Sequence, residues 1–401
     1  MNEENRSTGS FGRIVSYFLV AIVASLMTFY SVKSTPAAQK GGSTQGLAKL
    51  QELQSLLDQM YIGEIDEGYM MDMAAAGMVE GIEDQWSYYL PESQMQAYHD
   101  SMANSYVGIG VTVARLEDGS GFEVQRVEPG SPAQKSGIMP MDVVIGVDGV
   151  MVPDVGMDAA IDMVAGEQGT DVKLTVLRDE TRMEVVVTRD LVLVEVAYGK
   201  MVSDKIGYVH ITNFDSRCAQ ESIAAVESLL EQGAQALIFD VRFNPGGYRH
   251  ELVKLLDYLL PKGDLFKSVD YRGREDVDVS DASCVDVPMA VLINGDSYSA
   301  AEFFAAALKE YDYAVTVGQN TTGKGYFQQL FNLSDGSAVN LSVGKYFTPN
   351  GVSLAEVGGL KVDVPVEVDL ETAALIYGQM LPEEDDAQLQ AAIAALQEKL
   401  N

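Results

Sequence analysis

The chain has 401 residues, and 47% of them are hydrophobic, which suits two or three packed domains rather than a disordered polymer. Its formal net charge of -32 argues against a nucleic-acid partner, because phosphate binding needs clustered Lys and Arg side chains. The two cysteines, Cys218 and Cys284, form no C-x-x-C motif and have no nearby histidine pair, so neither a zinc site nor a redox motif is indicated. The sequence leaves open whether these two cysteines form a disulfide.

The first residues predict a membrane anchor. An uncharged apolar run from Ile14 to Tyr30, flanked by Arg13 and Lys33, is long enough for a spanning helix. No clean small-x-small cleavage site follows it, which favours an uncleaved signal anchor over a removed signal peptide. Residues 1–40 are therefore expected to form a cytoplasmic tail and one N-terminal transmembrane helix. The bulk of the protein is expected outside the cytoplasm, on a single-pass protein of the cell membrane.

Residues 41–100 are expected to form a helical region. After a Gly/Ser-rich spacer, apolar residues recur at helical spacing in two runs, 47–61 and 68–84. The second run contains a stripe of methionines, which is more typical of core packing than of a ligand surface.

Short β-rich runs separated by glycines begin at Tyr106. The stretches "YVGIGV" and "GSPAQKSGIMPMDVVIGVDG", followed by a short helix, resemble a PDZ domain of bacterial type over residues 101–190. A glycine-bearing loop with free amides can receive a terminal carboxylate, and the next strand can add a peptide by β-augmentation. The expected peptide-binding residues are Val107, Gly108, Ile109, Gly110 and Val111, with Ile109 and Val111 lining an apolar pocket.

Strands alternate with helices over residues 191–366, which predicts a layered α/β core. The run "FNLSDGSAVNLSVGKYF" predicts a hairpin that turns at Asp335 and Gly336. Residues 367–401 have a helical period and an acidic character. The fold class is therefore α/β (α+β) and multidomain.

Three stretches at the ends of these strands contain candidate catalytic groups. "DVRFNPGG" (240–247) runs from a strand into a glycine turn whose free N–H groups could hold an oxyanion. "NGDSYSAAE" contains Ser299 three residues before Glu302, a capping-box spacing that also suits a nucleophile at a helix N-terminus. "TTGKGYFQQ" contains Lys324 between two glycines.

These stretches resemble the carboxyl-terminal processing peptidases, or tail-specific proteases, in which the lysine follows the serine by 25 positions, as Lys324 follows Ser299 here. The resemblance extends through "EDQWSYYLP" (83–91) to "YFTPNGVSL" and "GGLKVDVPVEV". It implies a crotonase/ClpP-like protease core that needs no metal or organic cofactor. It also implies Ser299 as nucleophile, Lys324 as general base, Gln328 as the group that orients the lysine, and the amides of Gly247 and Ala300 as the oxyanion hole. The departures are Tyr298, Ala301 and Val362, and none removes a catalytic atom.

The chemistry agrees with these roles. A lysine can deprotonate serine near neutral pH only where its ammonium is desolvated, so Lys324 is expected in a mostly dry pocket. Gln328, four positions on, would lie on the same side of an extended strand and could hold the amine.

Other residues remain alternatives. Ser297 could be the nucleophile, and His250, which follows the oxyanion loop, could be the base of a Ser-His-Asp triad, although it is expected to point away. His210, inside an apolar strand, is expected to be a satisfied core group.

The resulting hypothesis is a serine endopeptidase that cleaves extracytoplasmic proteins near their C-termini, with the PDZ domain binding the substrate tail. Its partners would be a protein or peptide with a free C-terminus and, through the flanking helices 45–82 and 369–400, a second copy in a homodimer. The alternatives are an inactive PDZ scaffold with a protease-like core and a soluble-ligand-binding relative of the same core.

Overall fold

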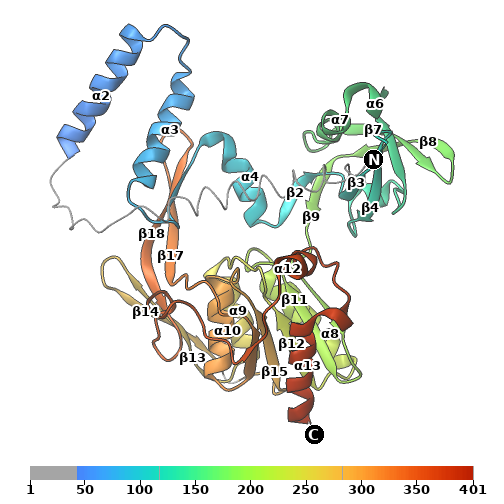
Figure 1. Cartoon of the computed structure of the whole chain (residues 1–401), viewed down its shortest axis with the longest axis vertical. Coiled ribbons are helices and arrows are strands. Elements are labelled where there is room, and N and C mark those ends of the chain that lie inside the picture. Colours follow the sequence, from blue (N-terminus) through green and yellow to red (C-terminus); the bar gives the residue numbers. More distant parts are fainter. Residues whose placement is uncertain (1–42, 117, 282, 401) are drawn as a thin grey trace, which may run out of the picture. The chain divides into compact units, whose positions relative to one another are not determined.

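The computed structural model describes residues 43–116, 118–281 and 283–400. The described chain divides into two units, with the boundary between Met70 and Met71 (Figure 1). The anchor expected at Ile14 to Tyr30 lies outside the described residues. Within the described ranges, no helix combines the length and the apolar character needed to cross a membrane.

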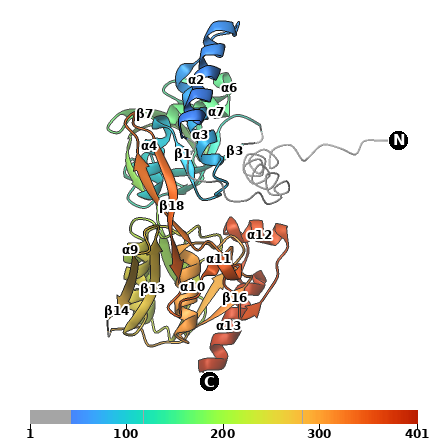
Figure 2. The same cartoon turned by 90° about the vertical axis from the view of Figure 1, so that its left-hand side faces the viewer.

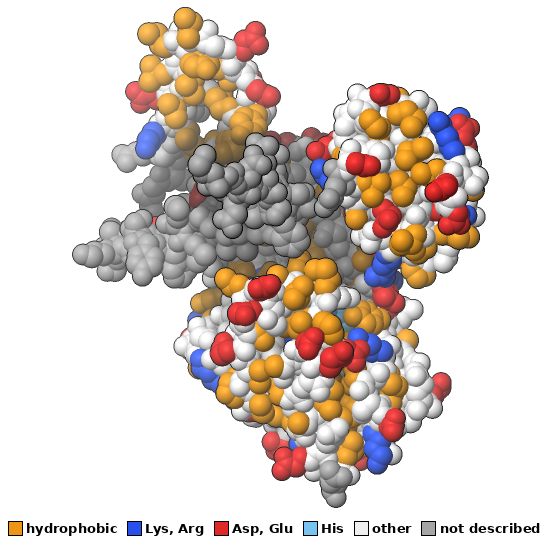
Figure 3. Space-filling view, turned by 45° about the vertical axis from the view of Figure 1, so that its right-hand side comes forward, with side chains coloured by type: hydrophobic (Ala, Val, Ile, Leu, Met, Phe, Trp, Pro, Cys, Tyr) orange, Lys and Arg blue, Asp and Glu red, His pale blue; other side chains and the backbone are white. Residues whose placement is uncertain are grey.

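Two helices open the described chain, α2 (Ser43–Met60) and α3 (Glu67–Glu80), close to the two predicted runs. Their apolar side chains are exposed, and hydrophobic atoms cover much of their visible surface in Figure 3. Met71, Met73 and Met78 of α3 are 53%, 54% and 65% exposed. The prediction that this methionine stripe packs into a core is therefore wrong for the single chain, because no element of the described chain covers it.

The PDZ-like region is an antiparallel sheet in the order β3-β4-β5-β7-β8. Fully buried valines such as Val124, Val144 and Val176 fill its core, as alternating strands with one buried face require. A two-stranded ribbon of β2 and β9 flanks this sheet in the chain. The elements are β2 (Ser105–Gly108), β3 (Val111–Arg115), β4 (Phe122–Val127), α5 (Pro132–Lys135), β5 (Val143–Val147), β6 (Val150–Met151), α6 (Val152–Val155), α7 (Met157–Val164), β7 (Asp171–Arg178), β8 (Thr181–Thr188) and β9 (Asp190–Leu193).

The core that follows is a six-stranded sheet in the order β10-β11-β12-β15-β16-β19, parallel except for β10. Its central strands are apolar on both faces because both faces are covered. Phe239 and Val291 pack with α8, α9 and α10, whereas Ile238 and Leu292 pack with α13 on the opposite face (Figures 1 and 2). The elements are β10 (Ala197–Met201), β11 (Ile206–Ile211), α8 (Cys218–Glu231), β12 (Ala236–Asp240), α9 (Arg249–Leu259), β15 (Met289–Ile293), α10 (Ala300–Glu310), β16 (Ala314–Gly318), β19 (Val364–Pro365) and α13 (Ala387–Leu400).

A second, antiparallel sheet joins distant parts of the chain. The predicted hairpin is confirmed as β17 (Tyr326–Asn332) and β18 (Ala338–Phe347), with Asp335 and Gly336 in its turn. Strand β18 also pairs with β1 (Tyr88–Leu90), so that Tyr88 lies opposite Asn340. This pairing places β1 beside β18, which also pairs with β17, the strand that follows Lys324. The sheet is completed by β13 (Gly263–Asp270) and β14 (Glu275–Ser280).

The remaining elements are α4 (Glu92–Met102), α11 (Leu354–Val357), α12 (Leu370–Tyr377) and a 3-10 turn (Glu383–Asp385). Cys218 is buried and Cys284 is exposed, and both are free thiols.

Candidate active site

Ser299 is the N-cap residue of α10, at the carboxyl end of β15. Its φ of 55° lies in a region that residues other than glycine rarely adopt. Backbone strain of this kind is typical of functional sites. Its N–H donates to the Glu302 carboxylate at 3.0 Å, as the capping-box spacing predicts. Ser297 differs, since it is fully buried and its hydroxyl donates to the Val241 carbonyl at 2.7 Å. That hydroxyl is occupied structurally, which removes Ser297 as the alternative nucleophile.

The glycine turn after β12 packs directly against the nucleophile. A Cβ atom on Gly246 would lie 2.7 Å from Ser299 Cβ and 2.8 Å from the Ala300 nitrogen, so only glycine fits there. Gly247 forms an isolated bridge with Phe214. Among the described residues, the N–H groups of Gly247 and Ala300 donate to no protein acceptor. Both N–H groups are therefore available to an oxyanion.

Glu302 connects the serine to the lysine. Its side chain is fully buried, and besides the Ser299 N–H it accepts hydrogen bonds from the N–H groups of Gly323 at 2.6 Å and Lys324 at 2.8 Å. The Thr321 hydroxyl also donates to it. Burial raises the pKa of this carboxyl, although the hydrogen bonds oppose the shift. One carboxylate thus holds the backbones of positions 299 and 324 together.

Lys324 lies in a partly dry, aromatic environment, as expected from the sequence. Its Nζ lies 4.5 Å from the centre of the Trp86 ring and 5.6 Å from that of Tyr298. Burial lowers the pKa of Lys324 to about 8, although the carboxylates of Asp84 and Glu302 oppose the shift. A large fraction of this lysine is therefore uncharged slightly above neutral pH, a property that a general base needs.

The contacts expected between the three catalytic groups are absent from this conformation. Within the described part of the chain, no hydrogen bond joins Lys324 Nζ to Ser299 Oγ or to Gln328. The Gln328 amide instead donates to the Ser342 hydroxyl at 3.0 Å and to the Tyr326 carbonyl at 3.2 Å. Catalytic hydrogen bonds are often unformed in substrate-free enzymes.

Sequence reasoning gave no catalytic role to the segment Asp84 to Ser87. It lies beside Lys324 because β1 pairs with β18. The only signal was the family resemblance of "EDQWSYYLP", which assigns no chemistry to these residues.

The PDZ loop keeps free donors. Val107 and Gly108 are in β2, whereas the N–H groups of Ile109 and Gly110 have no acceptor among the described residues. Gly110 has a φ of 81° and lies so close to Ser131 that a Cβ atom would be 2.3 Å from the serine Cβ. The Ile109 side chain is 4% exposed in the domain core, so it lines no open pocket in this conformation. Val111 is partly buried.

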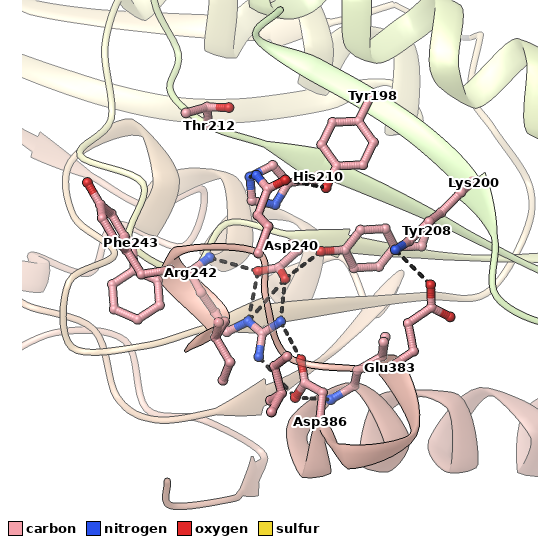
Figure 4. A pocket seen from close by; sticks show the side chains of 15 residues that line it. Tyr198, Lys200, Tyr208, His210, Thr212, Asp240, Arg242, Phe243, Glu383 and Asp386 are labelled. Carbon is pink, nitrogen blue, oxygen red and sulfur yellow. Dashed lines mark hydrogen bonds and ion pairs between the residues drawn. The ribbon is translucent and has the colours of Figure 1, made fainter. Parts of the chain in front are cut away.

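A cavity of about 440 Å³ lies elsewhere on the core (Figure 4). None of Ser299, Lys324 and Gln328 lines it. Arg242 lies between Asp240 and Asp386 in its wall, with ion pairs to both. His210 also lines it, with its Nε2 3.3 Å from Gln379 Nε2. Its buried Nδ1 has no hydrogen-bond partner among the described residues, so the prediction of a satisfied histidine is wrong for that nitrogen.

His250 is exposed, and its only ion-pair partner among the described residues is Glu251, at 3.6 Å. Its ring stacks on Tyr248, and no contact joins it to Ser299. As expected, it is not placed to act as the base in this conformation.

Comparison with known proteins identifies relatives over most of the chain. Residues 205–366 match peptidase family S41, and residues 100–177 match the PDZ domain family. The carboxy-terminal processing protease CtpA of Bacillus subtilis is 33% identical over 359 residues, which cover 87% of this chain and 76% of the relative. A Staphylococcus aureus protein named "Probable CtpA-like serine protease" is 28% identical over 361 residues, 88% of this chain and 71% of the relative. The solved Bacteroides fragilis structure named "Putative S41 protease" is 16% identical, covers 92% of this chain and 100% of its own, and has a TM-score of 0.51, which indicates a shared fold.

Proposed function

The chain belongs to peptidase family S41, among the carboxy-terminal processing serine proteases with a PDZ domain, and we propose that it is an endopeptidase with a Ser299-Lys324 dyad. The lowered pKa of Lys324 is the observation that supports this proposal most directly. An amine with a pKa of about 8 can accept the proton of a serine hydroxyl and later return it to the leaving amine.

The reaction proceeds by acyl transfer. Neutral Lys324 takes the hydroxyl proton while Ser299 Oγ attacks the scissile carbonyl carbon, and the carbonyl oxygen becomes an oxyanion. The free N–H groups of Gly247 and Ala300 stabilise that charge, and each such donor contributes about 3 kcal/mol. Protonation of the leaving nitrogen releases one product, and water then hydrolyses the acyl-enzyme. Gln328 orients the amine after Lys324 has left the Trp86 ring.

The PDZ domain captures the substrate tail in this proposal. The unpaired N–H groups of Ile109 and Gly110 are suitable donors for a terminal carboxylate, and β-augmentation would hold the residues before it. Val107, Gly108 and Val111 supply the strand edges on either side. The substrate class is therefore an unfolded protein or peptide with a free apolar C-terminus.

We further propose a single-pass anchor at Ile14 to Tyr30, with the protease outside the cytoplasm. The apolar run between Arg13 and Lys33 supports it. Protease treatment of intact cells is the test. Degradation of the full-length chain by added protease while the cells are intact supports this orientation. Resistance of the chain to added protease until the cells are lysed contradicts it.

Cleavage of an unfolded protein with an apolar tail tests the catalytic proposal. Ser299→Ala and Lys324→Ala are each expected to lower activity at least about 1,000-fold, because removal of either member of a catalytic pair abolishes the contribution of both. The matched controls are Ser120→Ala and Lys345→Ala, which change a partly exposed serine and a partly exposed lysine away from the dyad. A substrate with an amidated C-terminus is expected to raise KM through loss of the tail contact. Equal rates of proteolysis by the wild type and all variants would exclude the proposed Ser299-Lys324 dyad.

The alternative, an inactive scaffold, predicts a different pattern. Wild-type protein would bind the tail peptide but cleave nothing, and Ser299→Ala would bind with the same affinity.

A further inference from the structure

The segment from Asp84 to Ser87 lies inside the proposed catalytic centre. Several contacts with β18 hold it there in addition to the β1 pairing. The Ser87 hydroxyl accepts the N–H of Ser342 at 3.0 Å, and Asn340 donates to the Trp86 carbonyl at 3.4 Å. The segment therefore has a defined position relative to the lysine.

Trp86 and Tyr298 form an aromatic cage around the Lys324 ammonium. Their ring centres are 5.5 Å apart with an interplanar angle of 37°, and Nζ lies within 6 Å of both. A cation at this distance is attracted by the electron-rich ring faces. The cage therefore favours the charged form of the lysine.

Asp84 supplies the opposite charge. Its carboxylate is anchored by the Ser87 hydroxyl at 2.6 Å and by the N–H of Trp86 at 3.2 Å. Burial raises the pKa of Asp84, but these hydrogen bonds and one with Ser342 lower it by more than burial raises it. The net pKa is therefore below the usual value, and the group remains ionised. The charges of Asp84 and Lys324 stabilise each other.

The same carboxylate is linked to the orienting amide. Ser342, which interacts with Asp84, accepts a hydrogen bond from the Gln328 side chain at 3.0 Å. In this conformation the lysine is held by the cage and the glutamine by Ser342. Both groups that must approach Ser299 are therefore bound to the network that contains Asp84.

We propose that Asp84 is a positioning residue of the active site, which with the Trp86 and Tyr298 rings holds Lys324 as a cation in the substrate-free enzyme and so sets the pH at which this lysine becomes available as a base. The inference rests on the proposed function of Lys324. The lysine loses one proton to solvent, leaves the cage, and then accepts the hydroxyl proton of Ser299. The charged or titratable groups that face Lys324 are Asp84 before β1, Tyr298 before α10 and Glu302 in α10.

The pH profile of kcat/KM tests the inference, because it reports the ionisation of the free enzyme. Asp84→Asn removes the negative charge, so the acidic limb is expected to move to lower pH by about half a unit or more. Asp84→Glu keeps the charge and is expected to leave the limb near the wild-type position. The matched control is Asp72→Asn, which removes a carboxylate that bonds to Tyr89 of the adjacent strand and does not face Lys324.

Phosphonylation of Ser299 by a fluorophosphonate probe, in which the serine oxygen bonds to phosphorus and fluoride leaves, gives a second readout that needs no PDZ contact. Its rate is expected to show the same shift in Asp84→Asn, and thermal melting verifies that each variant is folded. A limb that stays at the wild-type pH in Asp84→Asn, with or without a lower kcat, overturns the inference. Full activity of Lys324→Ala would overturn the proposed function instead, so the two failures are distinguishable.

Discussion

At the residue scale, catalysis depends on a lysine whose charge is disfavoured by burial. The carboxylates of Asp84 and Glu302 oppose that effect, and the balance leaves the pKa of Lys324 at about 8. The rings of Trp86 and Tyr298 also lie beside its ammonium group. The strained backbone of Ser299 and the buried Glu302 fix the nucleophile relative to the lysine-bearing loop.

The lowered pKa of Lys324 predicts the pH dependence of activity. The base must be neutral, so kcat/KM should fall about tenfold per pH unit below pH 8 and level off above it. Initial rates with a peptide substrate between pH 6 and 10 measure this limb. A flat profile across pH 7 to 9 would contradict the assignment.

Gly246→Ala should damage catalysis through geometry alone. The added methyl group would collide with Ser299 and displace the N–H of Ala300, so kcat should fall about 100-fold or more. The matched control is Gly273→Ala, which has a similar positive φ but open space around it. Equal losses of activity in both variants would show that backbone strain, not contact with the nucleophile, is responsible.

At the element scale, the end of β12 is tied to the start of α13. Asp386 accepts two hydrogen bonds from Arg242, at 2.8 and 3.1 Å, and also caps the helix through the N–H groups of Gln388 and Leu389. Asp240 completes the network from within the sheet. This buried network holds the strand from which the oxyanion turn begins.

Asp386→Asn should therefore lower stability more than activity. Loss of one charged partner in a buried network is expected to lower the free energy of unfolding by about 2 kcal/mol. The control is Asp385→Asn, at the exposed neighbouring position, which should change it by less than about 0.5 kcal/mol. Urea unfolding followed by fluorescence measures both values. An unchanged midpoint for Asp386→Asn would mean that the network does not stabilise the fold.

The elements that sequence reasoning located are those with local signals. β12 and β15 are apolar runs before turns, and Asp335-Gly336 is a hairpin dipeptide whose conformation is set by its own residues. The contact of Trp86 with Lys324 spans more than 200 positions and depends on β1 pairing with β18, which no local pattern specifies. The partner of Gln328 and the orphaned nitrogen of His210 are likewise consequences of tertiary packing.

At the scale of the whole molecule, the described chain leaves an apolar surface uncovered. Leu47, Leu53 and Leu56 of α2 are 59%, 50% and 53% exposed, in agreement with the helical faces proposed to pair two copies. Homodimerisation would bury these side chains.

The full chain in detergent should therefore sediment at twice the chain mass at micromolar concentration. Leu53→Glu combined with Leu56→Glu should yield a monomer, since each buried charge would be unpaired. Val186→Glu, at an exposed site on β8, is the control. A wild-type monomer at these concentrations would exclude pairing through α2.

The most direct test of the Ser-Lys assignment is a crystal structure of the enzyme covalently modified on Ser299 by a peptidyl phosphonate. Lys324 Nζ should have left the Trp86 ring and lie about 3 Å from Ser299 Oγ, with the Gln328 amide turned toward it and an oxyanion mimic on the N–H groups of Gly247 and Ala300. Lys324 still on Trp86, with another base in contact with Oγ, would contradict the assignment.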